Sequence, residues 1–167
     1  EQADLVLMQN EIPLETIGYV TQKCADAGIK VLLNPAPAAP LKSEWLDAAT
    51  FVTPNEHELS ALYPGQDSQA VMKAHEGKII VTLGKAGVGY ATQGEIKTVP
   101  GFVVEPVDTT GAGDTFNGAF ATAIANGKSI RDAITYGNAA AALSILKLGA
   151  QEGMPTAQEV AKFMEER

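Results

Sequence analysis

Short apolar segments alternate with segments of helical periodicity along this chain, and this alternation constrains the fold most. Leu5–Met8 and Ile29–Leu33 are almost entirely apolar, which is typical of strands covered on both faces. Between them, Ile17, Val20 and Cys24 recur at helical spacing. Because strands that alternate with helices indicate βαβ units, the sequence predicts an α/β fold with a parallel sheet.

The same alternation continues to the end of the chain. We expect further strands at Phe51–Thr53, Lys78–Leu83, Val88–Thr92 and Ile96–Val99. We expect helices at Pro13–Ala27, Leu41–Ala49, Glu56–Leu62, Gln69–His75, Thr115–Asn126, Ile130–Leu146 and Thr156–Glu165. In such folds ligands bind beyond the carboxyl ends of strands. The polar motifs are expected at such ends, namely Asn10-Glu11, Asn34-Pro35, Asn55–Glu58, Gly84–Gly89 and Asp108–Asp114.

Composition narrows the class of protein. The 167 residues are 46% hydrophobic and 19% charged, and they contain no internal repeat or linker, so we expect a single domain over residues 1–167. A net charge of −8 argues against nucleic acid and anionic membranes as partners. Cys24 is the only cysteine and no apolar run could span a bilayer, so we expect a cytoplasmic protein. The chain starts without Met and enters a strand almost at once, so we expect its beginning to be missing.

The decamer at residues 108–117 carries the strongest chemical signal. It reads Asp-Thr-Thr-Gly-Ala-Gly-Asp-Thr-Phe-Asn, after the apolar stretch Val99–Val107 and before an Ala-rich helical run. Gly111 and Gly113 leave amide groups accessible at a helix N-terminus, which is a site for an anion. Asp114 at the rim of that site suits a base, and the combination suits phosphoryl transfer to a hydroxyl. A lone Gly-x-Gly turn is more often an ordinary helix start, but the complete decamer is far rarer.

Two further motifs have both a functional and a structural interpretation. Asn55 could bond a phosphate or its water and Glu58 could hold hydrated Mg²⁺, or the two could form a capping box. Gly84–Gly87 could let backbone approach a ligand, with Lys85 neutralising phosphate, or it could be an ordinary loop.

The last third of the chain offers two more such pairs of alternatives. Gly137 and its neighbouring alanines could admit an adenine ring, or they could serve tight helix packing. The loop from Lys147 to Gly153 could supply carbonyl oxygens to a monovalent cation, or Gly149 could end a helix.

Taken together, these motifs resemble the ribokinase family of sugar kinases, of the phosphofructokinase-B type. The resemblance rests on Asp108–Asn117, Asn34–Ala38, Thr53–Glu56, Thr82–Gly84 and Pro100–Phe102, in the family's order. It implies a ribokinase-like three-layer αβα fold with a mostly parallel sheet. It also implies ATP-dependent transfer of the γ-phosphoryl group to a sugar hydroxyl, with O5 of D-ribose expected as the acceptor. Another sugar or a nucleoside, or a nucleotide-binding module without catalysis, remain alternatives.

The resemblance assigns roles to individual residues. Asp114 corresponds to the catalytic base, and Gly111, Ala112 and Gly113 correspond to the anion hole. Asn55 and Glu58 correspond to a pair tied to phosphate and Mg²⁺, and Glu11 to a sugar contact. The nucleotide contacts correspond to Thr82, Leu83, Gly84, Lys85, Ala86, Gly87, Gly113 and Asn138. The positions that coordinate activating K⁺ correspond to Asp108, Thr110, Ser144, Lys147, Gly149 and Gly153.

The sequence also departs from the family pattern. The N-terminal Gly-Gly-x-x-x-Asn signature, which supplies most sugar contacts, has no match here. The small β-sheet lid, through which relatives often form homodimers, is also missing, and the segment Leu62–Lys78 is short. The resemblance therefore covers the C-terminal, ATP-binding part of the fold from about Ala3 onward. It implies ATP and a small sugar as ligands.

Overall fold

The structure, a computed structural model, describes residues 3–167, and its contacts divide the chain into two compact units. Residues 1 and 2, at which the chain starts, lie outside the described residues. The first unit contains the residues up to Leu83 together with Gly89–Thr98, and the second contains Gly84–Val88 and Val99–Arg167. The single domain expected over the whole chain stays a prediction.

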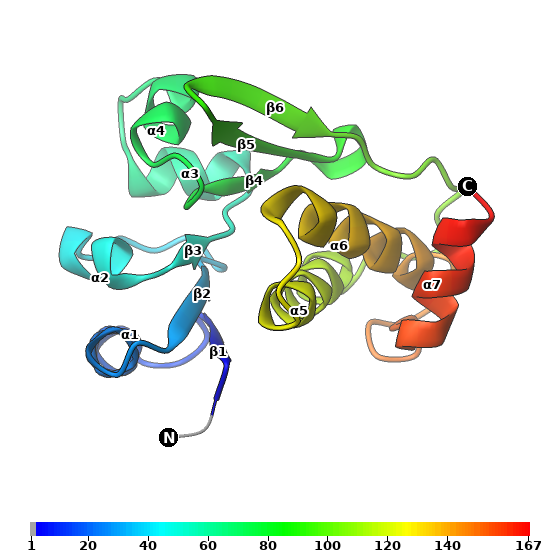
Figure 1. Ribbon diagram of the computed structural model, residues 1–167, viewed down its shortest axis with the longest axis horizontal. Helices are drawn as coiled ribbons and strands as arrows, with labels where there is room; N and C mark the ends of the chain where they lie inside the picture. The colour runs from blue at the N-terminus through cyan, green and yellow to red at the C-terminus, as the bar shows by residue number, and fades with distance from the viewer. Residues whose placement is uncertain (1–2) are drawn as a thin grey trace. The chain divides into compact units, whose positions relative to one another are not determined.

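Most of the strands, and helices α1–α4, belong to the first unit (Figure 1). Their bounds are β1 Leu5–Gln9, α1 Leu14–Asp26, β2 Lys30–Asn34, α2 Ser43–Ala48, β3 Phe51–Val52, α3 Glu56–Leu62, α4 Ser68–Ala74, β4 Ile80–Thr82, β5 Val88–Thr92 and β6 Glu95–Val99. Strands β1, β2 and β3 pair in parallel in that order. Two parallel bridges, Val52 with Ile79 and Asn55 with Thr82, continue the pairing to β4. The parallel sheet predicted from the alternation is therefore confirmed.

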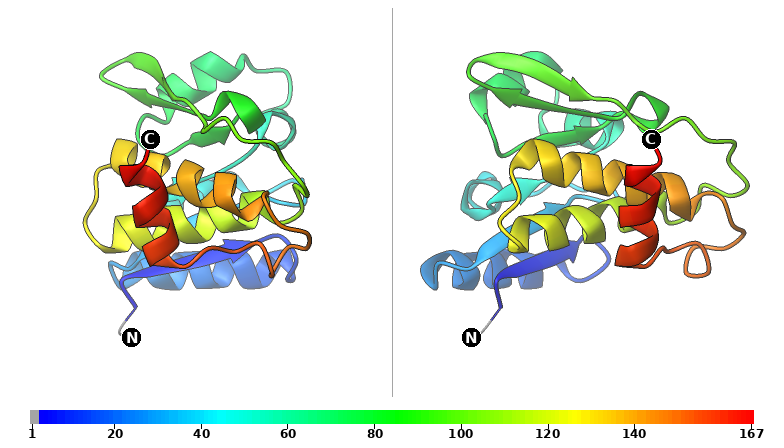
Figure 2. Two further views of the ribbon diagram at one scale, coloured as in Figure 1. Left: turned by 90° about the vertical axis from the view of Figure 1, so that its right-hand side faces the viewer. Right: turned by 45° about the vertical axis from the view of Figure 1, so that its right-hand side comes forward.

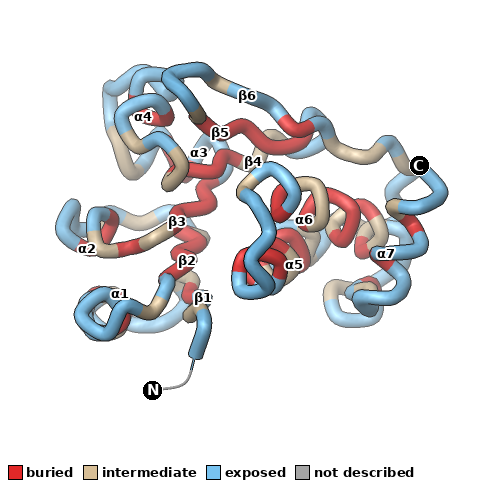
Figure 3. The backbone as a smooth tube through the Cα atoms, viewed as in Figure 1, coloured by how far each residue is buried: buried red, intermediate tan, exposed pale blue. Residues whose placement is uncertain are grey.

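The core of the first unit follows the alternation of side chains along the strands. Met8, Val31 and Leu33 point to the face that α1 and α2 cover, where Ile17 of α1 is fully buried against them. The tube of β2 and β3 is coloured as buried over most of its length (Figure 3). Leu32 points to the opposite face of the same strand and is also fully buried. Strand β2 is therefore covered on both faces, as its continuous apolar run predicts.

A close approach of α1 to α2 depends on one glycine. A Cβ atom on Gly18 would lie 2.2 Å from Cε2 of Trp45 in α2. The indole therefore packs directly on the α1 backbone, and an alanine at position 18 would force the two helices apart.

The second unit is helical. It contains a 3₁₀ turn at Gly84–Ala86, α5 Ala112–Ala125, α6 Ile130–Ser144 and α7 Ala157–Glu165. Helices α5 and α6 lie side by side along most of their length (Figure 2). A Cβ atom on Gly137 of α6 would lie 2.7 Å from the ring of Phe116 in α5. Helix packing is therefore the role that the structure shows for Gly137.

The segment before the decamer differs from its prediction. Residues 100–108 form no strand, although the Asp108 motif was expected at the end of one. Pro100 and Pro106 have no amide hydrogen to donate, and Val103 is 87% exposed, so this segment lacks both the hydrogen bonds and the burial that a strand needs. Within residues 3–167, no helix is long and apolar enough to cross a membrane.

Candidate active site

Three of the predicted motifs, together with Thr82, lie at one edge of the parallel sheet in the first unit. The register pairs Gln9 of β1 with Asn34 of β2, and the bridge pairs Asn55 with Thr82. Because the carboxyl ends of parallel strands meet at the same edge, Glu11 lies there too, just after β1. The structure therefore gathers the residues predicted to contact sugar, phosphate and nucleotide along the first unit's sheet edge.

Asn10 links the end of β1 to the segment that follows β2 through two hydrogen bonds at this edge. Its backbone amide donates to the Ala36 carbonyl at 2.8 Å, and its side-chain Nδ2 donates to the Pro37 carbonyl at 3.0 Å. The proline-rich turn is thereby held beside Glu11, whose own side chain is exposed. The sequence placed Asn10 beside a predicted sugar contact but did not show this bracing role.

Asn55 and Glu58 form a complete capping box at the start of α3. The Asn55 amide donates to Oε2 of Glu58 and the Glu58 amide donates to Oδ1 of Asn55, both at 2.8 Å. The capping interpretation is thus confirmed. It uses one oxygen of each side chain, so Nδ2 of Asn55 and Oε1 of Glu58 are left for other partners. A carboxylate oxygen of this kind fits hydrated Mg²⁺, which needs only one or two protein carboxylates beside phosphate oxygens.

Gly111 sets the start of α5 in the second unit. It is the N-cap residue in the left-handed conformation, with φ 77° and ψ 4°, and no side chain caps the helix. A Cβ atom at this position would also lie 2.9 Å from Cβ of Ala150. Glycine is therefore required here for both backbone conformation and space. Ala150 was not among the predicted residues, because its contact with Gly111 joins distant parts of the sequence.

The first turn of α5 leaves two amide groups without acceptors. Ala112 donates weakly to the Thr109 carbonyl at 3.3 Å, and Thr115 donates to the Gly111 carbonyl at 2.9 Å. Among the described residues, the amides of Gly113 and Asp114 donate no hydrogen bond. The Asp114 side chain is exposed, and the space where a Gly113 side chain would begin is open. An anion would therefore meet the amides of 113 and 114, rather than that of Ala112, beside a free carboxylate.

Asp108 ties the decamer to the loop after α6. Its Oδ1 accepts from the Thr110 amide at 2.9 Å and from the Thr110 hydroxyl at 2.7 Å, while Oδ2 accepts from the Gly149 amide at 2.9 Å. The hydrogen bonds from Thr110, followed by the one from Gly149, hold the pKa of Asp108 below its usual value. Asp108 therefore stays ionised and fixes both segments.

The residues assigned to K⁺ supply several oxygen atoms near the contact between Asp108 and Gly149. A Cβ atom on Gly153 would lie 2.2 Å from the Ser144 carbonyl oxygen and 3.3 Å from that of Gly149, so two carbonyls converge on a space that only glycine leaves open. The Asp108 carboxylate is bonded to the same Gly149 segment. Carboxylate and carbonyl oxygens are the donors that hard cations prefer, so this set fits K⁺.

Gly87 and Asn138 both contact the backbone of residues 99–101 within the second unit. Asn138, on α6, donates from Nδ2 to the Val99 carbonyl at 3.2 Å and to the Pro100 carbonyl at 3.1 Å. Lys85 is exposed, whereas Gly87 is buried, and a Cβ atom on it would meet the backbone of Val99 and Pro100. In the first unit, Thr82 ends β4, and the side chain of Leu83 packs into an apolar cluster, which leaves its backbone for ligands.

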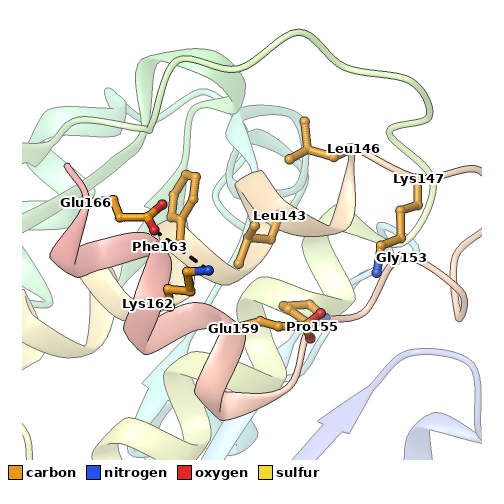
Figure 4. A pocket seen from close by; sticks show the side chains of 9 residues that line it. All are labelled: Leu143, Leu146, Lys147, Gly153, Pro155, Glu159, Lys162, Phe163 and Glu166. Atoms are coloured by element: carbon orange, nitrogen blue, oxygen red, sulfur yellow. Dashed lines mark ion pairs between the residues drawn. The ribbon is translucent and has the colours of Figure 1, made fainter.

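A groove between α6 and α7 is a separate feature of the second unit (Figure 4). It has a volume of about 260 Å³, with Leu143 and Phe163 among its apolar lining and a Lys162–Glu166 ion pair at its rim. Two of the K⁺ candidates, Lys147 and Gly153, line it, but Asp114 does not. The groove is therefore not the predicted phosphate site.

Comparison with known proteins identifies the family. The model of the pfkB family of carbohydrate kinases matches residues 1–157. The chain belongs to the pfkB family. Ribokinase of Bacillus subtilis is 49% identical over 164 residues, which cover 98% of this chain and 56% of that protein. This chain thus spans just over half the length of that protein, and likewise of Lactococcus lactis ribokinase.

Solved structures of family members share the fold. The structure of Arabidopsis thaliana ribokinase, complexed with ribose and ATP, superposes with a TM-score of 0.88 at 36% identity, covering 98% of this chain and 56% of that one. Ribokinase from Thermotoga maritima superposes with a TM-score of 0.85 at 40% identity, covering 97% and 57%. The ribokinase-like α/β fold predicted from the motifs is therefore confirmed.

Proposed function

We propose that this protein is an ATP-dependent kinase that phosphorylates a sugar, with O5 of ribose as the acceptor. The observation that carries the proposal is the open first turn of α5, where the unbonded amides of Gly113 and Asp114 adjoin the exposed Asp114 carboxylate. The pfkB match and the ribokinases among the relatives support ATP and ribose as substrates.

In the proposed reaction, Asp114 accepts the proton of the sugar hydroxyl. The hydroxyl oxygen forms a bond to the γ-phosphorus of ATP as the bond between that phosphorus and the β–γ bridging oxygen breaks, and ADP leaves. The amides at the start of α5 stabilise the negative charge on the transferring group because they point at it before the reaction begins. Glu11 binds the sugar and Gly84–Gly87 bind the nucleotide.

Different residues would hold the two metal ions, Mg²⁺ and K⁺. Glu58, through water, and Asn55 would hold Mg²⁺ and its phosphate, and the ion would neutralise charge on the phosphate oxygens. Asp108, Thr110 and carbonyl oxygens of the 144–153 loop would hold K⁺, which would order the segments on either side of Gly111. We further infer that the protein acts in the cytoplasm, in keeping with its single, buried cysteine.

The experiment measures ADP release from ATP with and without ribose, and measures ATP binding separately. We expect ATP to bind and ribose to increase the rate of ADP release. A panel of 2-deoxyribose, fructose and nucleosides then ranks the acceptors, and ribose should give the highest kcat/KM. Binding of ATP without stimulation by any sugar would contradict the kinase function and support a nucleotide-binding module, and absence of ATP binding would contradict both.

A further inference from the structure

Asn138 has a structural role in the second unit, in holding nearby backbone, that its sequence motif does not indicate. The side chain is 7% exposed, and both hydrogens of its Nδ2 group point at backbone carbonyls, those of Val99 and Pro100. The amide is therefore fixed in orientation, because exchanging its oxygen and nitrogen would place the oxygen against these two carbonyls.

The backbone that Asn138 holds lies directly against the 84–87 loop. A Cβ atom on Gly87 would lie 2.1 Å from the Val99 carbonyl oxygen and 2.6 Å from the Gly101 amide nitrogen. From the other side, a Cβ atom on Gly101 would lie 3.2 Å from the Lys85 carbonyl oxygen. Two glycines thus bring the two backbone segments into contact with no side chain between them.

These contacts form a continuous connection from α6 to the loop. Asn138 fixes the Val99 and Pro100 carbonyls, these and Gly101 fix Gly87, and Gly87 ends the 3₁₀ turn Gly84–Ala86. Lys85 and Ala86 are exposed, so little other burial holds the turn. The hydrogen bonds of Asn138 therefore support this loop from a helix, through the backbone of residues 99–101.

We propose that Asn138 is a positioning residue that holds the Gly84–Gly87 loop in its nucleotide-binding conformation through the carbonyls of Val99 and Pro100. This inference rests on the proposed function for its link to ATP. A loop that is already ordered loses less entropy when ATP binds, so the effect falls on ATP affinity rather than on the sugar.

The test uses Asn138→Ala and a matched control, Asn126→Ala. Asn126 also donates from Nδ2 to a backbone carbonyl, that of Thr122, but at the exposed end of α5. Asn138→Ala should speed hydrogen exchange of the 84–88 amides relative to those of α7 in the ligand-free protein. It should also weaken ATP binding about ten-fold and leave the KM for sugar unchanged, because two modest hydrogen bonds are lost. Asn126→Ala should change none of these.

A second variant keeps the test decisive if Asn138→Ala folds poorly. Gly101→Ala presses on the Lys85 carbonyl from the other end of the connection, so it should weaken ATP binding as well. In the double variant the two losses should be clearly less than additive. Unchanged loop exchange and ATP affinity in both variants would overturn the inference. If wild-type protein bound no ATP, the proposed function would fail, but the exchange rates of the 84–88 amides would still decide the role of Asn138.

Discussion

Helices α3 and α5 begin in opposite ways. At α3, the side chains of Asn55 and Glu58 accept hydrogen bonds from each other's amides, so side chains cap the first turn. At α5, the N-cap is a left-handed glycine with no side chain, and the amides of Gly113 and Asp114 have no acceptor among the described residues. The first helix start is capped by side chains, whereas the second has no side-chain cap and leaves the amides of Gly113 and Asp114 for a ligand.

This difference means that the start of α5 is less stable than a helix start capped by a side chain. A helix start with a glycine N-cap is less stable than one with Ser, Thr, Asp or Asn by roughly a few tenths of a kcal/mol. Helix α7 shows that the second unit also contains a complete cap, since Thr156 and Glu159 form a capping box there. The open start of α5 is therefore a local feature, and the variants below test whether phosphate binding accounts for it.

The largest effect is expected from Asp114→Asn. The amide cannot accept the hydroxyl proton, so turnover should fall by about 10²–10⁴-fold while ATP affinity stays close to wild type. Steady-state kinetics and calorimetric ATP binding measure the two quantities. Asp132→Asn, which changes an acid in the first turn of α6, is the control and should keep its turnover. Retention of turnover in Asp114→Asn would show that the base lies elsewhere.

Gly113→Ala tests whether phosphate needs the open space at the start of α5, or whether Gly113 serves only the flexibility of the backbone. Its Cβ atom would enter open space, so protein stability should be unchanged or higher by up to about 1 kcal/mol. The methyl group would occupy space beside the free amides, so kcat/KM for ATP should fall by roughly ten- to a hundred-fold. Chemical denaturation and kinetics measure the two effects, and a variant that kept its activity would place the phosphate away from this turn.

Gly111→Ala should act on stability first. Alanine in the left-handed conformation costs about 1–2 kcal/mol, and its methyl group would also press on Ala150. Gly65→Ala is a matched control, because Gly65 has a similar φ of 76° but nothing within 4 Å of its missing Cβ. The free energy of unfolding should fall further for Gly111→Ala than for Gly65→Ala. Equal losses would mean that the contact with Ala150 contributes nothing.

Glu58→Gln tests the capped helix start for a second role. Glutamine can still accept the hydrogen bond from the Asn55 amide, so the melting temperature should change little. Loss of the charge should raise the Mg²⁺ concentration that gives half-maximal activity by about ten-fold. Glu159→Gln makes the same change in the capping box of α7 and should leave the Mg²⁺ dependence unaltered. Identical behaviour of the two variants would restrict Glu58 to capping.

The smallest effect concerns pH and the cap of α7. Hydrogen bonds from Thr156 lower the pKa of Glu159 below its usual 4.5, with a small further effect of Lys147. Because the pKa is lowered in the folded state, the ionised cap stabilises α7 above that usual value, and this contribution disappears as the pH falls through the folded pKa. Thr156→Ala should return the NMR titration midpoint of Glu159 toward 4.5. An unchanged midpoint would contradict the assigned cause.

The sequence predicted local features well and missed contacts between distant residues. Helix α3 and strand β5 have the predicted bounds, because a capping motif precedes the one and a Gln93-Gly94 turn ends the other. The Asp108 motif does not lie at the end of a strand as expected, since the burial of the apolar stretch before it depends on neighbours that an apolar pattern does not reveal. Likewise, Asn138 and the Val99 carbonyl are 39 residues apart in sequence, so only the fold could show their hydrogen bond.

The most direct test of the open helix start is an NMR titration of the backbone amides. On addition of ATP, the signals of Gly113 and Asp114 should shift, while addition of adenosine, which lacks phosphate, should leave them in place. The amides of Thr156 and Glu159 in the capping box of α7, which already have acceptors, should show much smaller shifts in either case. Unmoved signals of Gly113 and Asp114 at saturating ATP would contradict the claim that the start of α5 holds phosphate.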